Sequence, residues 1–108
     1  MKNLLQETLS VLQEHGKTKE DVLWCGSDSL GHFSWAVFEK FADVEYDEND
    51  DSPHVNIDLL IVGKDFWLER WYDADMYLEW WLYRDRSEDP DRFDSFNKLN
   101  KPTTLFLR

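Results

Sequence analysis

The acidic segment DENDDSPHVNID, residues 47–58, has the residue types of a calcium-binding loop. Its first, third, fifth and twelfth positions hold oxygen ligands, as such loops require: Asp47, Asn49, Asp51 and Asp58. The fit is incomplete, because Ser52 stands where the loop needs glycine and the run that follows is typical of a strand instead of a helix. We therefore interpret the segment as a solvated acidic loop, with calcium binding as the alternative.

Two pairs of residues have side chains of the kinds that enzymes use in catalysis. Glu69 and Glu79 could face each other across two strands, as paired carboxylates do in glycosidases, but nothing in 108 residues indicates a sugar-sized cleft. Cys25 and His32 could form a nucleophile and its base, but Cys25 stands in an apolar run, where an inert buried thiol is the norm. The glycines are too dispersed to form a phosphate-binding loop. We predict no catalytic residue, no metal site and no cofactor.

The segment from Phe66 to Tyr83 holds eight aromatic residues, including four of the six tryptophans of the chain. Side chains of a strand alternate between its two faces, so the predicted strands 66–72 and 76–84 each separate an apolar even set from an odd set. If the connecting loop preserves this alternation, the odd residues form one aromatic and acidic face: Trp67, Glu69, Trp71, Tyr77, Glu79, Trp81 and Tyr83. Such a face suits Arg and Lys side chains. We expect either an open binding platform or a face covered by the C-terminal segment.

The charge of the chain restricts its partners. With 23 acidic and 12 basic residues, the net charge is -11, which disfavours direct binding to nucleic acid or to an anionic membrane. It favours a basic protein partner, a cation, or simple solubility. Carboxylates held in place can imitate the phosphates of DNA, and the candidates for such a patch are Asp47, Glu48, Asp50 and Asp51.

The pattern of apolar residues predicts an α+β fold in a single domain, residues 1–108. Helices are predicted over 3–15, with Gly16 as the stop, and over 35–42, with Ser34 as the cap. Strands are predicted over 22–27, 44–46, 57–63, 66–72 and 76–84, with an edge strand over 105–107 and a turn around Gly31. We expect the two N-terminal helices to pack on an antiparallel meander sheet of three to four strands.

No apolar run approaches the roughly 20 residues of a membrane helix, and the N-terminus has no signal-peptide core. The single cysteine allows no internal disulfide, which fits a reducing cytoplasm. These features favour a protein of the cytoplasm.

Five stretches within residues 17–102 resemble small acidic proteins of temperate phages and prophages of Gram-positive bacteria: KTKEDVLWCGS, FSWAVFEKFADVEYD, DLLIVGKDFWLERWYD, EWW and KLNKP. The chain departs from that pattern in the longer ADMYLEWWLYRDRSEDPDRF and in the acidic DENDDSPHVN, where similar proteins are richer in glycine. The resemblance implies an accessory protein acting in the bacterial host cytoplasm, and it implies no enzymatic activity. Small acidic phage proteins often inhibit host defence, anti-CRISPR proteins among them.

Together, these observations predict a non-enzymatic acidic binding protein that occupies a basic, nucleic-acid-binding surface of a bacterial protein such as a CRISPR effector. Two patches are the candidates for the contact: the acidic loop with Asp47, Glu48, Asp50 and Asp51, and the sheet face with Trp67, Glu69, Trp71, Glu79 and Trp81. The alternatives are a calcium-binding protein and a structural protein that associates with its own copies through the tryptophans.

Overall fold

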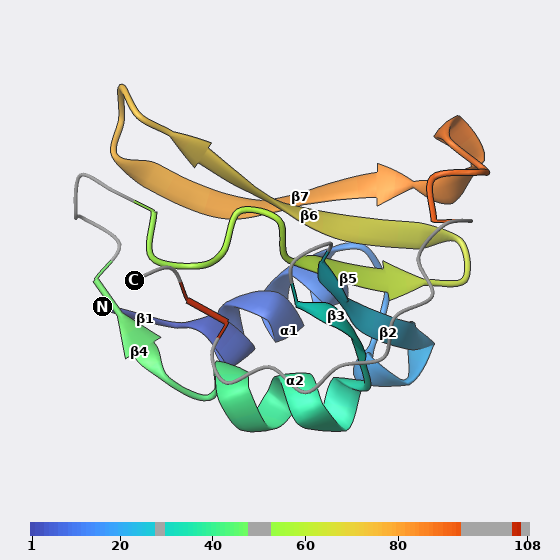
Figure 1. Cartoon of the computed structure of the whole chain (residues 1–108), viewed down its shortest axis with the longest axis horizontal. Helices are drawn as coiled ribbons and strands as arrows, with labels where there is room; N and C mark the ends of the chain where they lie inside the picture. Colours follow the sequence, from blue (N-terminus) through green and yellow to red (C-terminus); the bar gives the residue numbers. More distant parts are fainter. Residues whose placement is uncertain (28–29, 48–52, 94–104, 107–108) are drawn as a thin grey trace.

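The computed structural model describes residues 1–27, 30–47, 53–93 and 105–106 (Figure 1). Its α-helices are α1 (Leu4–Glu14) and α2 (Trp35–Ala42), and its short 3-10 turns are η1 (Lys19–Asp21) and η2 (Arg86–Glu88). The strands are β1 (Lys2–Asn3), β2 (Val22–Ser27), β3 (Gly31–Phe33), β4 (Glu45–Tyr46), β5 (Leu60–Gly63), β6 (Phe66–Asp73) and β7 (Leu78–Asp85).

Both helices begin and end where their local sequence signals place them. The side chain of Asn3 accepts a hydrogen bond from the backbone N–H of Gln6, and the side chain of Ser34 accepts one from Val37, so each helix has a capped N-terminus. Gly16, at a φ of 71°, follows the end of α1. The predicted helices over 3–15 and 35–42 are therefore confirmed, the first to within one residue at each end.

The prediction of a three- to four-stranded meander is wrong. The main sheet has five antiparallel strands in the order β3-β2-β5-β6-β7, and β1 and β4 form a second, two-stranded sheet. β2 pairs with β5 only after the chain has passed through α2 and β4, so the strands do not follow one another along the sheet. The class is still α+β, but the sheet is assembled across a long connection.

The additional strand comes from residues that the sequence predicted to be a turn. Gly31 and Phe33 bound β3, which pairs with β2. Gly26 makes this pairing possible: its φ is 149°, and a Cβ atom built there would lie 1.8 Å from the carbonyl oxygen of Gly31. The close approach of the two backbones turns the predicted loop into an edge strand.

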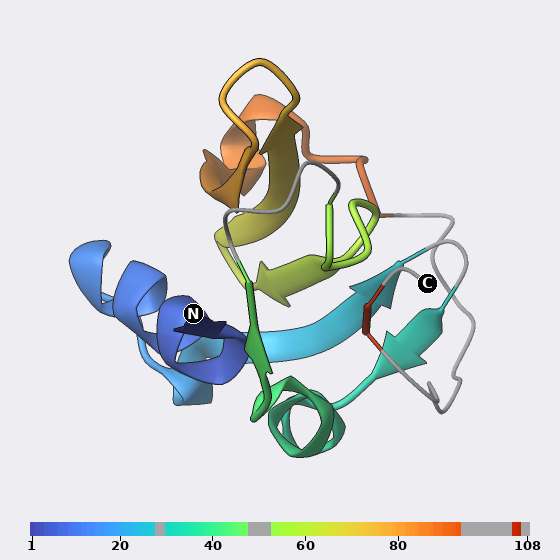
Figure 2. The ribbon, with the colours of Figure 1, turned by 90° about the vertical axis from the view of Figure 1, so that its left-hand side faces the viewer.

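The two faces of the sheet are covered differently. The helices α1 and α2 lie on one side of the main sheet (Figure 2). Their buried side chains, such as Leu12 and Phe38, pack in one core with Ile61 and Leu68 of the sheet. On the other face, Leu60, Val62 and Trp67 form a smaller cluster with Phe93, which follows η2. None of the helices in the described residues is long and apolar enough to cross a membrane.

Replacing Gly26 by alanine should lower the free energy of unfolding by about 3 kcal/mol or more, because the added methyl group meets backbone and cannot be accommodated by a rotamer change. Gly16→Ala is the matched control. It also places a side chain at positive φ, but nothing lies within 4 Å of its Cβ, so we expect a loss of about 1 kcal/mol. Urea denaturation followed by tryptophan fluorescence measures both, and equal losses would contradict the steric explanation.

Candidate protein-binding surface

The pairing of β6 with β7 decides which aromatic side chains share a face. Trp71 lies opposite Trp80, and Arg70 lies opposite Trp81, so odd residues of β6 share a face with even residues of β7. The connection that reverses the expected alternation is Ala74–Tyr77, four residues long, with Tyr77 at a φ of 52°. The expectation that Glu79 and Trp81 lie on one face with Trp67, Glu69 and Trp71 is therefore wrong.

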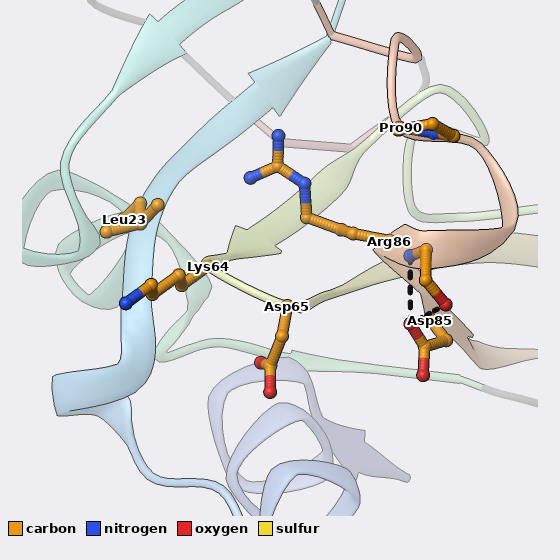
Figure 3. Close-up of a pocket in the computed structure, with 7 residues that line it drawn as sticks. Leu23, Lys64, Asp65, Asp85, Arg86 and Pro90 are labelled. Carbon is orange, nitrogen blue, oxygen red and sulfur yellow. Dashed lines mark hydrogen bonds between the residues drawn. The ribbon is translucent and has the colours of Figure 1, made fainter.

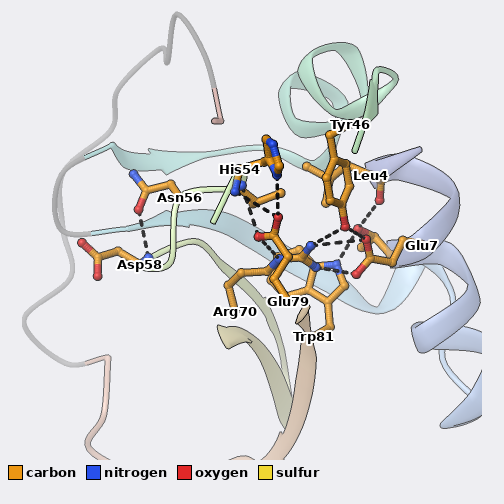
Figure 4. Close-up of polar contacts among 11 residues, drawn as sticks. Leu4, Glu7, Tyr46, His54, Asn56, Asp58, Arg70, Glu79 and Trp81 are labelled. Carbon is orange, nitrogen blue, oxygen red and sulfur yellow. Dashed lines mark hydrogen bonds and ion pairs between the residues drawn. The ribbon is translucent and has the colours of Figure 1, made fainter. Parts of the chain in front are cut away.

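Glu79 and Trp81 instead point into the core beside the buried Arg70 (Figure 4). Glu79 is 2% exposed and accepts hydrogen bonds from the backbone N–H groups of His54 and Val55, at 3.0 and 3.2 Å. The indole N–H of Trp81 donates to the hydroxyl of Thr8 in α1, at 2.9 Å. The polar groups of both side chains thus form hydrogen bonds within the protein. The two residues connect β7 to α1 and to the segment before β5, and they offer little surface to a partner.

Arg70 is the centre of this buried polar cluster, although only 4% of the residue is exposed. Its guanidinium donates to the carboxylate of Glu7 and to the hydroxyl of Tyr46, lies 3.6 Å from the carboxylate of Glu79, and stands over the ring of Trp81. The hydroxyl of Tyr46 also donates to Glu7. The alternation of β6 already placed Arg70 among the apolar even residues, but nothing in the sequence indicated Glu7 or Tyr46 as its partners.

The environment keeps the charges of the cluster in place. Burial is the largest single effect on Arg70 and by itself would lower its pKa, but the hydrogen bond to Glu7 and the electrostatic attraction of Glu7, Tyr46 and Glu79 together outweigh it, so the pKa is raised. Burial also raises the pKa of Tyr46 far above its ordinary value, and the neighbouring Arg70 offsets only part of this rise. The cluster therefore holds a charged guanidinium beside a neutral phenol, as a structural element of the core.

The opposite face of the hairpin is half covered and half open. Trp67 is 5% exposed, because the ring of Phe93 packs edge-on against it with the centroids 5.4 Å apart. Trp71, two pleats further along β6, is 45% exposed. Between them Glu69 accepts a hydrogen bond from Arg84 at 3.0 Å. Of the three tryptophans predicted for the contact patch, Trp67, Trp71 and Trp81, only Trp71 presents a large open ring.

A hollow of about 290 Å³ lies beside Trp71 on this face. It combines exposed apolar surface, notably Ile57, with charged side chains of both signs. The residues that line it are Ile57, Asp58, Leu60, Glu69, Arg70, Trp71 and Arg92.

Beyond Trp71 the chain continues to the tip of the β6–β7 hairpin, which projects at one end of the molecule (Figure 1). Met76 is 68% exposed and Tyr77 is 53% exposed. The carboxylate of Asp73 accepts hydrogen bonds from the backbone N–H groups of Asp75 and Met76, which gives the turn a defined shape. We call Trp71, Asp73, Asp75, Met76 and Tyr77 the hairpin surface, which combines exposed apolar side chains with carboxylates.

Of the four residues of the acidic loop, the structure describes Asp47. Asp47 is exposed, whereas Glu48, Asp50 and Asp51 lie outside the described residues, as does Asn49 of the calcium-loop pattern. Asp58 is exposed as well, and its backbone N–H donates to the side chain of Asn56. In the part of the chain that the structure describes, no group of three or more His, Cys, Asp or Glu side chains is arranged to hold a metal ion.

Cys25 and His32 do not form a catalytic pair. The register sets Cys25 opposite Phe33 and Gly26 opposite His32, so the side chains of Cys25 and His32 project from opposite faces of the sheet. The ring of His32 stacks on Trp24 with centroids 3.8 Å apart, and burial lowers its pKa. Cys25 is completely buried, and burial raises its pKa well above the ordinary value, which opposes formation of a nucleophilic thiolate.

A second hollow, of about 400 Å³, lies near the β5–β6 turn (Figure 3). Its charged lining residues balance, because two acids and two bases contribute to it, and Arg86 already donates to the backbone carbonyl of Gly63. The lining residues are Leu23, Lys64, Asp65, Asp85, Arg86, Ser87 and Pro90. Because the charges of its lining residues cancel, this hollow favours neither an anionic nor a cationic ligand.

Comparison of the chain with protein-family models, with curated proteins and with solved structures finds no match in any of the three. A function must therefore be inferred from the surface itself.

The variant Arg70→Met should lower the free energy of unfolding by about 3–5 kcal/mol, because it leaves the carboxylates of Glu7 and Glu79 without their cation in the core. Arg84→Met is the control. It breaks a hydrogen-bonded pair of the same kind with Glu69, but one that water reaches, and should cost at most about 1 kcal/mol. Denaturant titration of both variants measures the difference, and similar costs would show that Arg70 is not the structural centre.

Cys25 should react with iodoacetamide roughly a hundredfold more slowly in the folded protein than in denaturant, because the thiol is buried and its thiolate is disfavoured. The raised pKa also sets a sign for stability. The folded state holds the thiol proton more tightly, so the contribution of this group is complete below the ordinary thiol pKa and declines as the pH rises above it. Rapid labelling of the folded chain would restore Cys25 as a candidate nucleophile.

Proposed function

We propose that this protein is a non-enzymatic acidic binding protein that docks onto a cationic protein surface through its hairpin surface. The observation that carries the proposal is the exposure of Trp71, Met76 and Tyr77 beside the carboxylates of Asp73 and Asp75. Trp67 and Trp81 of the same hairpin are buried, so these exposed side chains stand out against a well-packed background.

This combination of groups suits a partner rich in arginine and lysine. Tryptophan and tyrosine are favoured anchors in protein interfaces, and their ring faces attract cations by about 0.5–2 kcal/mol per contact. Carboxylates beside the rings add charge-assisted hydrogen bonds. The net charge of -11 supplies a long-range field that steers a basic partner toward the protein and repels nucleic acid.

In its specific form, the proposal is that the partner is a nucleic-acid-binding protein of a bacterium, and that this protein is a phage-encoded inhibitor acting in the host cytoplasm. Surfaces that bind phosphate backbones carry clustered arginine and lysine, which are the side chains that the hairpin surface suits. The acidic loop from Asp47 to Asp51 would enlarge the contact. A bound inhibitor of this kind would prevent the partner from binding DNA or RNA, as a DNA mimic does.

The immobilised protein should retain basic nucleic-acid-binding proteins from a nuclease-treated bacterial lysate, and retention should decrease as the salt concentration is raised, because salt screens the attraction. Addition of DNA should compete with retention. Retention that ignores salt, or a retained fraction without basic proteins, would contradict the electrostatic proposal.

Affinity for a partner isolated in this way should fall about tenfold or more with Trp71→Ala and with the double variant Asp73→Asn/Asp75→Asn. Asparagine retains the side-chain oxygen that accepts the turn hydrogen bonds, so the second variant removes charge while preserving the shape of the turn. The matched controls are Leu23→Ala, which removes another exposed apolar side chain, and Glu14→Gln/Glu20→Gln, which removes two exposed charges elsewhere. Calorimetry gives the affinities, and equal losses in variants and controls would show that binding does not use the hairpin surface.

A further inference from the structure

We propose that the hollow beside Trp71 receives one arginine side chain of the partner and thereby selects that partner. The inference rests on the proposed function, because it takes from it a cationic protein that docks at the hairpin surface. It adds the site at which one side chain of that protein is recognised. The volume of the hollow, about 290 Å³, suits a single side chain, because pockets for whole small molecules begin at about this size.

The hollow adjoins the hairpin surface on the same face of the main sheet. Leu60 lies opposite Glu69 in the pairing of β5 with β6, and Trp71 follows two residues further along β6. Residues two apart in a strand share a face, so all three side chains lie on one side of the sheet. Trp71 belongs both to the hollow and to the hairpin surface, so a partner that covers the hairpin surface also lies over the hollow.

Two exposed apolar side chains from separate segments form part of the wall. Trp71 of β6 is 45% exposed, and Ile57, from the segment before β5, is 49% exposed. Exposed apolar groups that meet in a hollow are typical of a binding site. The methylene stem of an arginine can lie along such a wall, and its planar guanidinium can stack on the indole ring.

The segment that carries Ile57 is held in a tight turn. The side chain of Asn56 accepts a hydrogen bond from the N–H of Asp58 at 2.9 Å, and its carbonyl accepts one from Leu59 at 3.0 Å. The N–H of Asn56 donates to the carbonyl of Leu105 at 2.9 Å. Ile57 and Asp58 are therefore presented in a defined arrangement, which reduces the entropy that binding must cost.

Two carboxylates of the hollow are open to a cation. Asp58 is exposed, and its carboxylate lies outside the buried cluster of Arg70 (Figure 4). The side chain of Glu69 is 23% exposed. Arg84 donates through Nε to Oε1 of Glu69, and a bond to Oε1 leaves the acceptor sites of Oε2 for a further donor.

Two bases also line the hollow, but only one of them adds charge to its open surface. The side chain of Arg70 has no exposed surface, and its guanidinium is paired with Glu7 and Glu79 in the core. Arg92 is exposed and stands over the ring of Phe93, 5.2 Å from its centroid. The exposed side chains of this hollow therefore include two acids and one base, whereas the charges of the second hollow cancel.

This set of groups favours arginine over lysine. A guanidinium has five N–H donors in one plane, so its edge can donate to the carboxylates of Asp58 and Glu69 while its face covers the ring of Trp71. The ammonium group of lysine is compact and more strongly hydrated, so it gains less from an aromatic wall. A second copy of the chain is disfavoured as the occupant, because both copies carry a net charge of -11.

The test uses the blocked tripeptide Gly-Arg-Gly and two matched peptides in which lysine or citrulline replaces the arginine. Citrulline retains the shape of the side chain but has no charge. In the ¹⁵N-labelled protein, the arginine peptide should shift the indole N–H signal of Trp71 saturably at roughly millimolar concentration. It should bind about threefold or more tightly than the lysine peptide, and the citrulline peptide should give no saturable shift.

Single charge changes test the same site from the side of the protein. Asp58→Asn should weaken binding of the arginine peptide about fivefold or more, and Arg92→Gln should strengthen it about twofold, because it removes the base that opposes the ligand. The matched controls, Glu14→Gln and Lys40→Gln, remove the same charges from exposed positions on α1 and α2. At physiological salt, screening should keep the effect of either control below about 1.5-fold.

Several results would overturn the arginine site. They are equal binding of the arginine and citrulline peptides, equal binding of the arginine and lysine peptides, saturable shifts that do not include Trp71, or equal effects of Asp58→Asn and Glu14→Gln. A shift of Trp71 that grows with protein concentration in the absence of peptide would make a second copy the occupant and would overturn the arginine.

The proposed function fails separately from this site. An arginine peptide bound at Trp71, together with no retention of basic proteins from the lysate, would sustain the arginine site and reject the function. A retained basic partner whose affinity is unchanged by Asp58→Asn would sustain the function and reject the arginine site.

Discussion

A guanidinium group enclosed in the core is the constraint on which the rest of this structure depends. The side chain of Arg70 has no exposed surface, and its partners come from three other elements: Glu7 of α1, Tyr46 of β4 and Glu79 of β7. Removing a cation from water costs several kcal/mol, so burial of Arg70 is favourable only when all three of these elements are in place. The cluster thereby specifies one arrangement of helix, small sheet and hairpin.

The same cluster also connects the sheet to a segment outside the helices and strands. Glu79 accepts hydrogen bonds from the backbone of His54 and Val55, in the segment that precedes β5. Because a carboxylate can satisfy backbone donors that no strand reaches, this short stretch is held without a sheet partner for those groups. Tyr46 and His54, the described residues near the two ends of the acidic segment, are thus both held by this cluster.

The register of the β6–β7 hairpin connects this internal cluster with the external surface. A strand pair has two faces, so the register that turns Glu79 and Trp81 toward Arg70 also turns Trp80 outward, opposite Trp71. A shift of one residue would place Trp81 in solvent and leave Arg70 without Glu79. Core electrostatics and the composition of the hairpin surface are therefore consequences of one pairing.

By itself, the sequence determined what depends on neighbouring residues: the two capped helices, the strand β2, the strand regions of β6 and β7, and the α+β class. The signals for these are local, since a cap acts over three residues and alternation over two. Only the tertiary structure decided the order of the strands in the main sheet, the edge strand β3, the partners of Arg70 and the face on which Trp81 lies. These depend on the close approach of Gly26 to Gly31 and on the four-residue connection from Ala74 to Tyr77, where a single residue more or less would reverse every side chain that follows.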